Sequence, residues 1–149
     1  MKTEFPNARS YTAEAARFPP RTIVDIQAEQ RQVSASYSNT VLLDVNGDCM
    51  RMAVFEGEYR WHYHPDSDEL FLVVAGELEI DFDEGVRTRL GPWQCLVVPA
   101  GTVHRTRAIG RTVNVTFEKQ QAGVSLIAEG SRRVCMRCRK DDVSERDPE

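Results

Sequence analysis

The feature that most restricts the fold of this chain is a series of short apolar runs, each ended by a glycine, a proline or an Asn-Gly pair. Residues 41–45 and 49–55 flank Asn46-Gly47, and two apolar runs around such a pair strongly indicate a β-hairpin. Further runs follow at 59–64, 69–74, 77–83, 86–90, 95–98, 103–109 and 112–118. Because helical segments do not alternate with these runs, a parallel α/β sheet is not expected. The pattern predicts an all-β sandwich or barrel.

The composition is that of one globular domain. The chain has 149 residues, 41% of them hydrophobic and 28% charged, which excludes intrinsic disorder as the main state. Its net charge of -4 lacks the basic excess of most nucleic-acid-binding proteins, and no apolar run approaches the roughly 20 residues of a membrane helix. We therefore expect neither a nucleic-acid nor a membrane partner. The polar first ten residues do not resemble a signal peptide, so we expect a cytoplasmic protein with reduced cysteines.

Three stretches differ in character. Residues 1–39 predict an irregular or partly helical arm that packs on the barrel or on a partner subunit, and within it residues 23–35 fit either a short helix or an edge strand. Residues 40–128 contain the strands. Residues 129–149 are highly charged and predict a flexible tail. The tail carries Cys135 and Cys138, which we interpret as two thiols, with a disulfide or an intersubunit zinc ion as alternatives.

The three histidines of the chain fall into one pattern with a carboxylate. His62 and His64 are two residues apart, so on a strand both imidazoles lie on one face. A turn at 65–68 would bring Glu69 back beside this pair, and in a closed barrel His104 would face the same interior. Imidazole and carboxylate ligands suit a divalent transition metal. The alternative is a set of ordinary hydrogen-bonded histidines, but the shared pattern favours a metal site.

Residues at matching positions of the neighbouring strands are predicted to wall an apolar cavity around this site. Arg60 shares the face of His62 and either binds an anionic substrate or lies solvated at the barrel mouth. The predicted substrate-contacting residues are Arg60, Phe71, Leu78, Ile80 and Thr106.

Other residues are predicted to face away from that interior. Trp61 and Tyr63 would then pack in a second layer or at a subunit interface. Glu77, Glu79 and Asp81 alternate with apolar residues and predict a solvated acidic face.

Two segments resemble the paired motifs of the cupin superfamily. The segment from Gly57 to Gly76 contains a glycine, a His-x-His pair, a glutamate and a second glycine, as in the first cupin motif, and Pro99 to His104 resembles the second. Over roughly residues 40–118 the chain is similar to small single-domain cupins of the cupin 2 type without an assigned activity. The resemblance implies a double-stranded β-helix, or jelly roll, that assembles as a homodimer. It also implies a metal bound by His62, His64, Glu69 and His104.

Several functions are consistent with such a site. Our first hypothesis is an enzyme with one divalent transition metal per chain (Fe, Mn, Ni, Cu, Co or Zn) and dioxygenase-like chemistry on a small organic molecule. A cupin isomerase or epimerase is an alternative within the enzymes. A second hypothesis is a non-catalytic module that binds a metal or a small molecule, and a third is a barrel with only a structural role. The residues identify neither the metal nor the substrate.

Overall fold

The structure is a computed structural model that describes residues 14–128. The predicted tail, with Cys135 and Cys138, lies outside the described residues. Within the described range the fold is all-β, as predicted, and eight strands form one sheet. The elements are α2 (Ile26–Arg31), β1 (Tyr37–Val45), β2 (Asp48–Glu58), β3 (His62–Tyr63), β4 (Glu69–Phe82), β5 (Arg87–Leu90), β6 (Cys95–Val98), β7 (His104–Lys119) and β8 (Ser125–Leu126).

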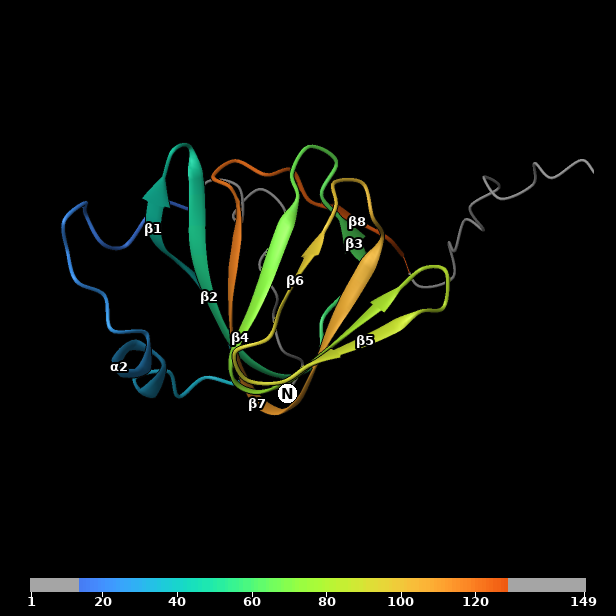
Figure 1. The fold of residues 1–149 in the computed structure, drawn as a ribbon, viewed down its shortest axis with the longest axis horizontal. Helices are drawn as coiled ribbons and strands as arrows, with labels where there is room; N and C mark the ends of the chain where they lie inside the picture. Colours follow the sequence, from blue (N-terminus) through green and yellow to red (C-terminus); the bar gives the residue numbers. More distant parts are fainter. Residues whose placement is uncertain (1–13, 129–149) are drawn as a thin grey trace, which may run out of the picture.

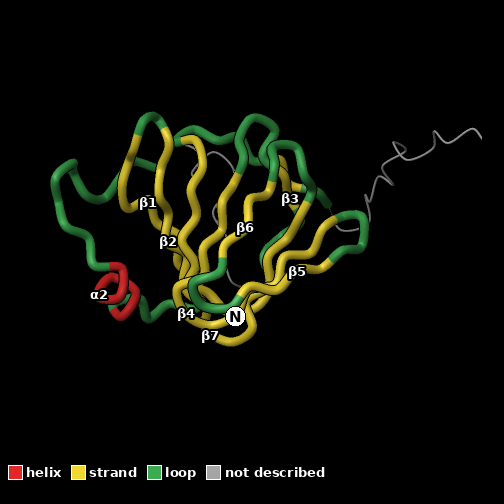
Figure 2. The backbone as a smooth tube through the Cα atoms, viewed as in Figure 1, coloured by secondary structure: helices red, strands yellow, loops and turns green. Residues whose placement is uncertain are grey.

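The long strand β7 is the centre of the sheet. It pairs antiparallel with β2 on one side and with β4 on the other. Strand β1 extends the sheet beyond β2, whereas β5 and β6 both pair with β4. Beyond the end of β2, the short strand β3 takes the place beside β7 and pairs in turn with β8. The sheet curls strongly, so that its strands surround an interior (Figures 1 and 2).

Two pairs of predicted runs form single long strands, because the chain bends at glycines without leaving the sheet. The separate runs at 69–74 and 77–83 form the single strand β4, with register shifts at Ala75, and those at 103–109 and 112–118 form β7. Gly76 has a φ of 81°, and a Cβ there would lie 2.6 Å from Oγ1 of Thr112. That hydroxyl donates to the carbonyl of Glu77 at 2.9 Å and accepts from its amide at 3.2 Å. The bend is thus held by side-chain as well as backbone hydrogen bonds.

The predicted hairpin at Asn46-Gly47 is confirmed. Val45 pairs with Asp48, and Asn46 and Gly47 have φ values of 53° and 80°, as a type I′ turn requires. The predicted strand at 95–98 coincides with β6. The predicted strand at 59–64 is much shorter, because only His62–Tyr63 pairs as a strand and residues 59–61 are irregular.

Both faces of the sheet carry an apolar cluster. The inner cluster includes Phe55, Phe71, Leu78 and Ile80. The outer cluster contains Leu42, Met52, Val54, Val74, Val113 and Val115, against which Phe18, Val24, Ile26 and Val33 of the arm pack. The part of the arm from Phe18 to Val33 therefore packs on the outer face of the sheet. Of the two alternatives for residues 23–35 the helix is realised, and Asp25 caps α2 by accepting from the amide of Ala28.

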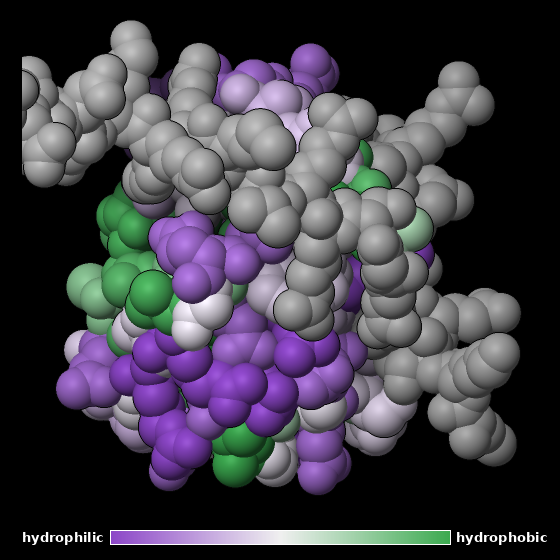
Figure 3. Space-filling view, turned by 90° about the vertical axis from the view of Figure 1, so that its right-hand side faces the viewer, coloured by the Kyte–Doolittle hydropathy of each residue, from purple (hydrophilic) through white to green (hydrophobic). Residues whose placement is uncertain are grey.

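The acidic stripe of β4 is solvated as predicted only at Glu77, and the prediction is wrong for the other two residues. Glu79 and Asp81 are only 4% and 7% exposed, because arginine side chains from β5 and β7 lie over them. The shortest contacts join Arg87 to Asp81 at 2.5 Å and Arg89 to Glu79 at 2.6 Å. The face of the molecule on the side of β5 is largely hydrophilic (Figure 3). Within residues 14–128, no helix is long and apolar enough to cross a membrane.

Candidate metal centre

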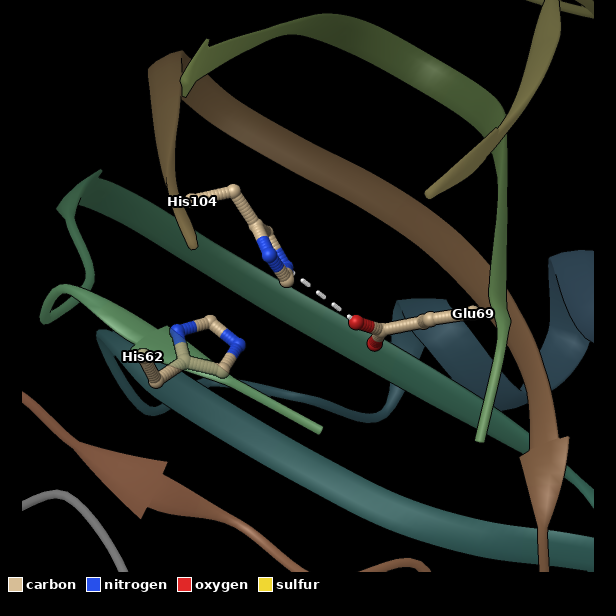
Figure 4. Close-up of side chains that lie close together, drawn as sticks. All are labelled: His62, Glu69 and His104. Atoms are coloured by element: carbon tan, nitrogen blue, oxygen red, sulfur yellow. Dashed lines mark ion pairs between the residues drawn. The ribbon is translucent and has the colours of Figure 1, made fainter. Parts of the chain in front are cut away.

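The four predicted metal ligands come together inside the curled sheet. His62 lies on β3 opposite His104 at the start of β7, while Glu69 begins β4 and His64 follows β3 directly. All four are at most 5% exposed. The turn at 65–68 folds Glu69 back as predicted, and Asp68 fixes it by accepting from the amide of Ala100 at 2.8 Å. Side chains from three separate strands thus converge on one point (Figure 4).

The distances fit a shared ion. Oε2 of Glu69 lies 3.1 Å from Nε2 of His64 and 3.3 Å from Nε2 of His104. One donor atom from each of His62, Glu69 and His104 lies within 4.8 Å of the others. The rings of His62 and His104 approach to 4.4 Å between centroids. These separations suit His62, Glu69 and His104 as ligands around a common centre, whereas His64 belongs to an adjoining group that it forms with Glu69 and Glu118.

Each histidine is oriented by a hydrogen bond to the backbone. Nδ1 of His62 bonds the carbonyl of Arg60 at 2.8 Å, Nδ1 of His64 that of Gly123 at 2.8 Å, and Nδ1 of His104 that of Thr102 at 2.9 Å. Because a carbonyl only accepts, Nδ1 carries the proton in each ring, and in the neutral ring Nε2 keeps its lone pair. Outer hydrogen bonds of this kind fix the tautomer of metal-binding histidines. The three rings are therefore prepared as Nε2 ligands.

Burial and neighbouring charges separate the pKa values of these groups. Burial, aided by His104, lowers the pKa of His62 to about 3, so this ring is neutral. Burial also acts to lower the pKa of His64, but the close contact with Glu69 and the charges of Glu69 and Glu118 outweigh it and raise the pKa to about 9. The imidazoles of His104 and His64 outweigh the opposing effect of burial on Glu69 and hold its pKa below the usual range. The carboxylate is therefore charged, and a metal competes with the proton on His64.

The unsatisfied atoms also fit a metal. Oε2 of Glu69 and Nε2 of His104 are buried, yet neither makes a hydrogen bond of good geometry to any described residue. Leaving such groups unsatisfied costs about 1–3 kcal/mol each. Nitrogen and oxygen donors of this kind are ligands of divalent first-row metals. The residues present thus match the metal implied by the sequence motifs.

One acidic residue of the site was not foreseen from the sequence. Glu118, on β7, is 3% exposed, and its Oε2 lies 3.7 Å from Nε2 of His64. A signal was available, since the polar residues Thr112, Asn114, Thr116 and Glu118 alternate with apolar ones along this strand. All four are buried, as expected if they share the inner face.

A small cavity adjoins the centre. About 40 Å³ is open to the centres of water-sized molecules, room for on the order of three waters. Its lining includes His62, His64 and Glu69, and also Tyr37, Asn39, Ala53, Phe55, Tyr59, Phe71, Thr106, Asn114, Thr116 and Val124. Apart from the site residues, the wall thus has four aromatic side chains, four with an amide or hydroxyl group, and two that are aliphatic.

Only some of the predicted substrate-contacting residues line the cavity. Phe71 and Thr106 line the cavity, whereas Leu78 and Ile80 are fully buried in the inner apolar cluster. Arg60 is exposed, with its guanidinium 5.9 Å from the ring centre of Tyr59, which agrees with the solvated alternative. The inward position for Arg60 rested on a regular strand through residues 59–64. Because residues 59–61 are irregular, that alternation does not hold.

Three imidazoles and a carboxylate inside a curled antiparallel sheet are characteristic of one class of protein, the cupins. The sequence profile of the cupin domain matches residues 50–117. The chain is 47% identical over 105 residues to "Uncharacterized protein YdbB" of Bacillus subtilis (strain 168), covering 70% of this chain and 93% of that protein. The chain belongs to the cupin family.

Solved structures agree with this assignment. A cupin-2 domain containing protein from Shewanella frigidimarina superposes with a TM-score of 0.62 at 26% identity, covering 65% of this chain and 94% of that one. An uncharacterized conserved protein with a double-stranded β-helix domain from Klebsiella pneumoniae gives a TM-score of 0.62 at 22% identity, covering 72% and 92%. The predicted jelly-roll fold is confirmed.

Proposed function

We propose that this protein is a metal-dependent cupin enzyme of the dioxygenase type that acts on a small organic molecule. The observation that carries the proposal is the set of three histidines, each with Nδ1 bound to a backbone carbonyl, around the buried carboxylate of Glu69. His62, His64, Glu69 and His104 would hold one divalent transition metal per chain (Fe, Mn, Ni, Cu, Co or Zn). When bound, the metal supplies Lewis acidity and, for a redox-active ion, electron transfer.

The cavity wall supports a neutral substrate. Among the described residues that line it, none carries an arginine or lysine side chain, and Arg60 is exposed to solvent instead. Burial raises the pKa values of Tyr37 and Tyr59, so both phenols stay protonated and able to donate hydrogen bonds. Asn39, Asn114 and the hydroxyls would orient polar groups of the substrate, while Phe71 packs against its apolar part.

The protein is further proposed to be a cytoplasmic homodimer. Cys49 and Cys95 carry free thiols, which suits a reducing compartment. The dimer rests on the cupin resemblance and on the single-domain size of the chain.

The enzymatic proposal is tested by oxygen uptake after anaerobic reconstitution with Fe²⁺. Small neutral compounds that chelate metals through two oxygens are screened, with His62→Ala as the inactive variant and Glu79→Gln, outside the cavity, as the active control. We expect oxygen consumption in step with substrate loss. Conversion without oxygen uptake would favour an isomerase, and binding without any conversion would favour a non-catalytic module.

A further inference from the structure

We propose that Glu118 is a further ligand of the metal centre, which binds the ion through Oε2 while Oε1 stays paired with Arg51. The inference rests on the metal site of the proposed function. It adds a second carboxylate to the four residues of the two sequence motifs, from a position 14 residues beyond His104.

The placement of Glu118 is the first argument. Its side chain is buried in the interior, and Oε2 lies 3.7 Å from Nε2 of His64. One donor atom from each of His64, Glu69 and Glu118 lies within 4.8 Å of the others. A second group of donor atoms consists of His62, Glu69 and His104. The carboxylate of Glu69 is common to both groups, so the two groups are adjacent. The orphaned Oε2 of Glu69 lies where they meet.

Arg51 holds Glu118 in this orientation. This guanidinium is 1% exposed, and its Nε lies 2.9 Å from Oε1 of Glu118. Its Nη1 lies 2.9 Å from Oε2 of Glu14 in the arm and 3.4 Å from Oδ1 of Asn39. Arg51 is held in place by the carboxylates of Glu14 and Glu118. Its contact with Oε1 of Glu118 leaves Oε2 of the same carboxylate facing His64.

The charges of these contacting side chains are the second argument. Among the described residues that make these contacts, Glu69 and Glu118 bring two buried negative charges and Arg51 brings one buried positive charge, while Glu14, which also contacts Arg51, has a side chain that is 30% exposed. When a metal replaces the proton on His64 the imidazoles are neutral, and one negative charge then remains in this interior, which is costly to bury without compensation. A divalent cation bound between the two carboxylates offsets that charge.

The test uses Co²⁺ alone as the probe, because its visible absorption reports the number and kind of ligands. Glu118→Gln should weaken Co²⁺ binding at least about tenfold and should change the absorption bands. Glu79→Gln is the matched control, since Glu79 is an equally buried carboxylate that is held by arginine outside the site. It should change neither quantity.

Glu118→Gln leaves the charge of Arg51 buried beside a neutral partner, which is destabilising. If this variant does not fold, a second pair of variants decides the question. Arg51→Met should keep the wild-type bands, and Arg51→Met combined with Glu118→Gln should lose them. Wild-type bands in the folded Glu118 variants, with or without weaker binding, would overturn the inference. A wild-type protein that binds no Co²⁺ would instead overturn the proposed function itself.

Discussion

At the scale of single residues, Gly76 has the most demanding position in the sheet. Its φ of 81° is strained for any other residue, and a Cβ would meet Thr112 Oγ1 at 2.6 Å and the Arg111 carbonyl at 2.7 Å. We expect Gly76→Ala to lower the free energy of unfolding by about 2–4 kcal/mol, the sum of backbone strain and overpacking. Gly85→Ala, with a φ of 84° but open space, should cost only about 1 kcal/mol. Urea unfolding measures both, and equal losses would contradict the close approach at Gly76.

The site residues differ in how far the sequence could predict them. His62, His64 and Glu69 lie within one short segment, so the strand alternation and one turn suffice to bring them together. Glu118 was missed because it lies beyond both motifs, and its approach to His64 depends on the pairing of β7 across the whole sheet. The inward position of Arg60 failed for a local reason, since the chain is irregular just before β3.

At the scale of elements, the ladder of arginines and carboxylates on β4, β5 and β7 predicts acid sensitivity. Hydrogen bonds from Arg89 and Arg87 hold the pKa values of Glu79 and Asp81, respectively, below their ordinary range. A carboxyl whose pKa is lowered by folding stabilises the protein above its unfolded pKa, and this stability is lost as the pH falls through the folded pKa. We therefore expect stability to decline in the acidic range below about pH 4.

Thermal melting of the metal-free protein against pH measures this effect. The double variant Glu79→Gln with Asp81→Asn should show a flatter acid limb than the wild type. Glu56→Gln, an exposed residue of β2, serves as the control and should keep the wild-type slope. An unchanged slope in the double variant would show that the ladder contributes nothing to acid sensitivity.

The same elements show what local sequence patterns could and could not indicate. The hairpin at Asn46-Gly47 was predictable, because its turn depends on two adjacent residues. The bends at Gly76 and Gly110 were interpreted as strand ends, since a glycine with positive φ marks a turn and a bulge equally well in sequence. Only the pairing of β4 with β7 on both sides of the bend distinguishes the two.

At the scale of the whole molecule, the expected assembly is a homodimer. Static light scattering at micromolar concentration should therefore give about twice the chain mass of 16.9 kDa. This expectation rests on the cupin resemblance and on the single-domain size of the chain. A measured mass equal to that of one chain would reject the dimer and leave the metal site unaffected.

The metal centre itself is the central claim, and elemental analysis of the purified, untagged protein tests it most directly. We expect about one equivalent of a divalent transition metal in the wild type and in Glu79→Gln, and at least a tenfold loss in Glu69→Ala and His104→Ala. Both loss variants should keep the β-sheet circular dichroism of the wild type, because the apolar clusters on both faces remain. Undiminished metal in the folded His104 and Glu69 variants, or no metal in the wild type after anaerobic reconstitution, would contradict the account.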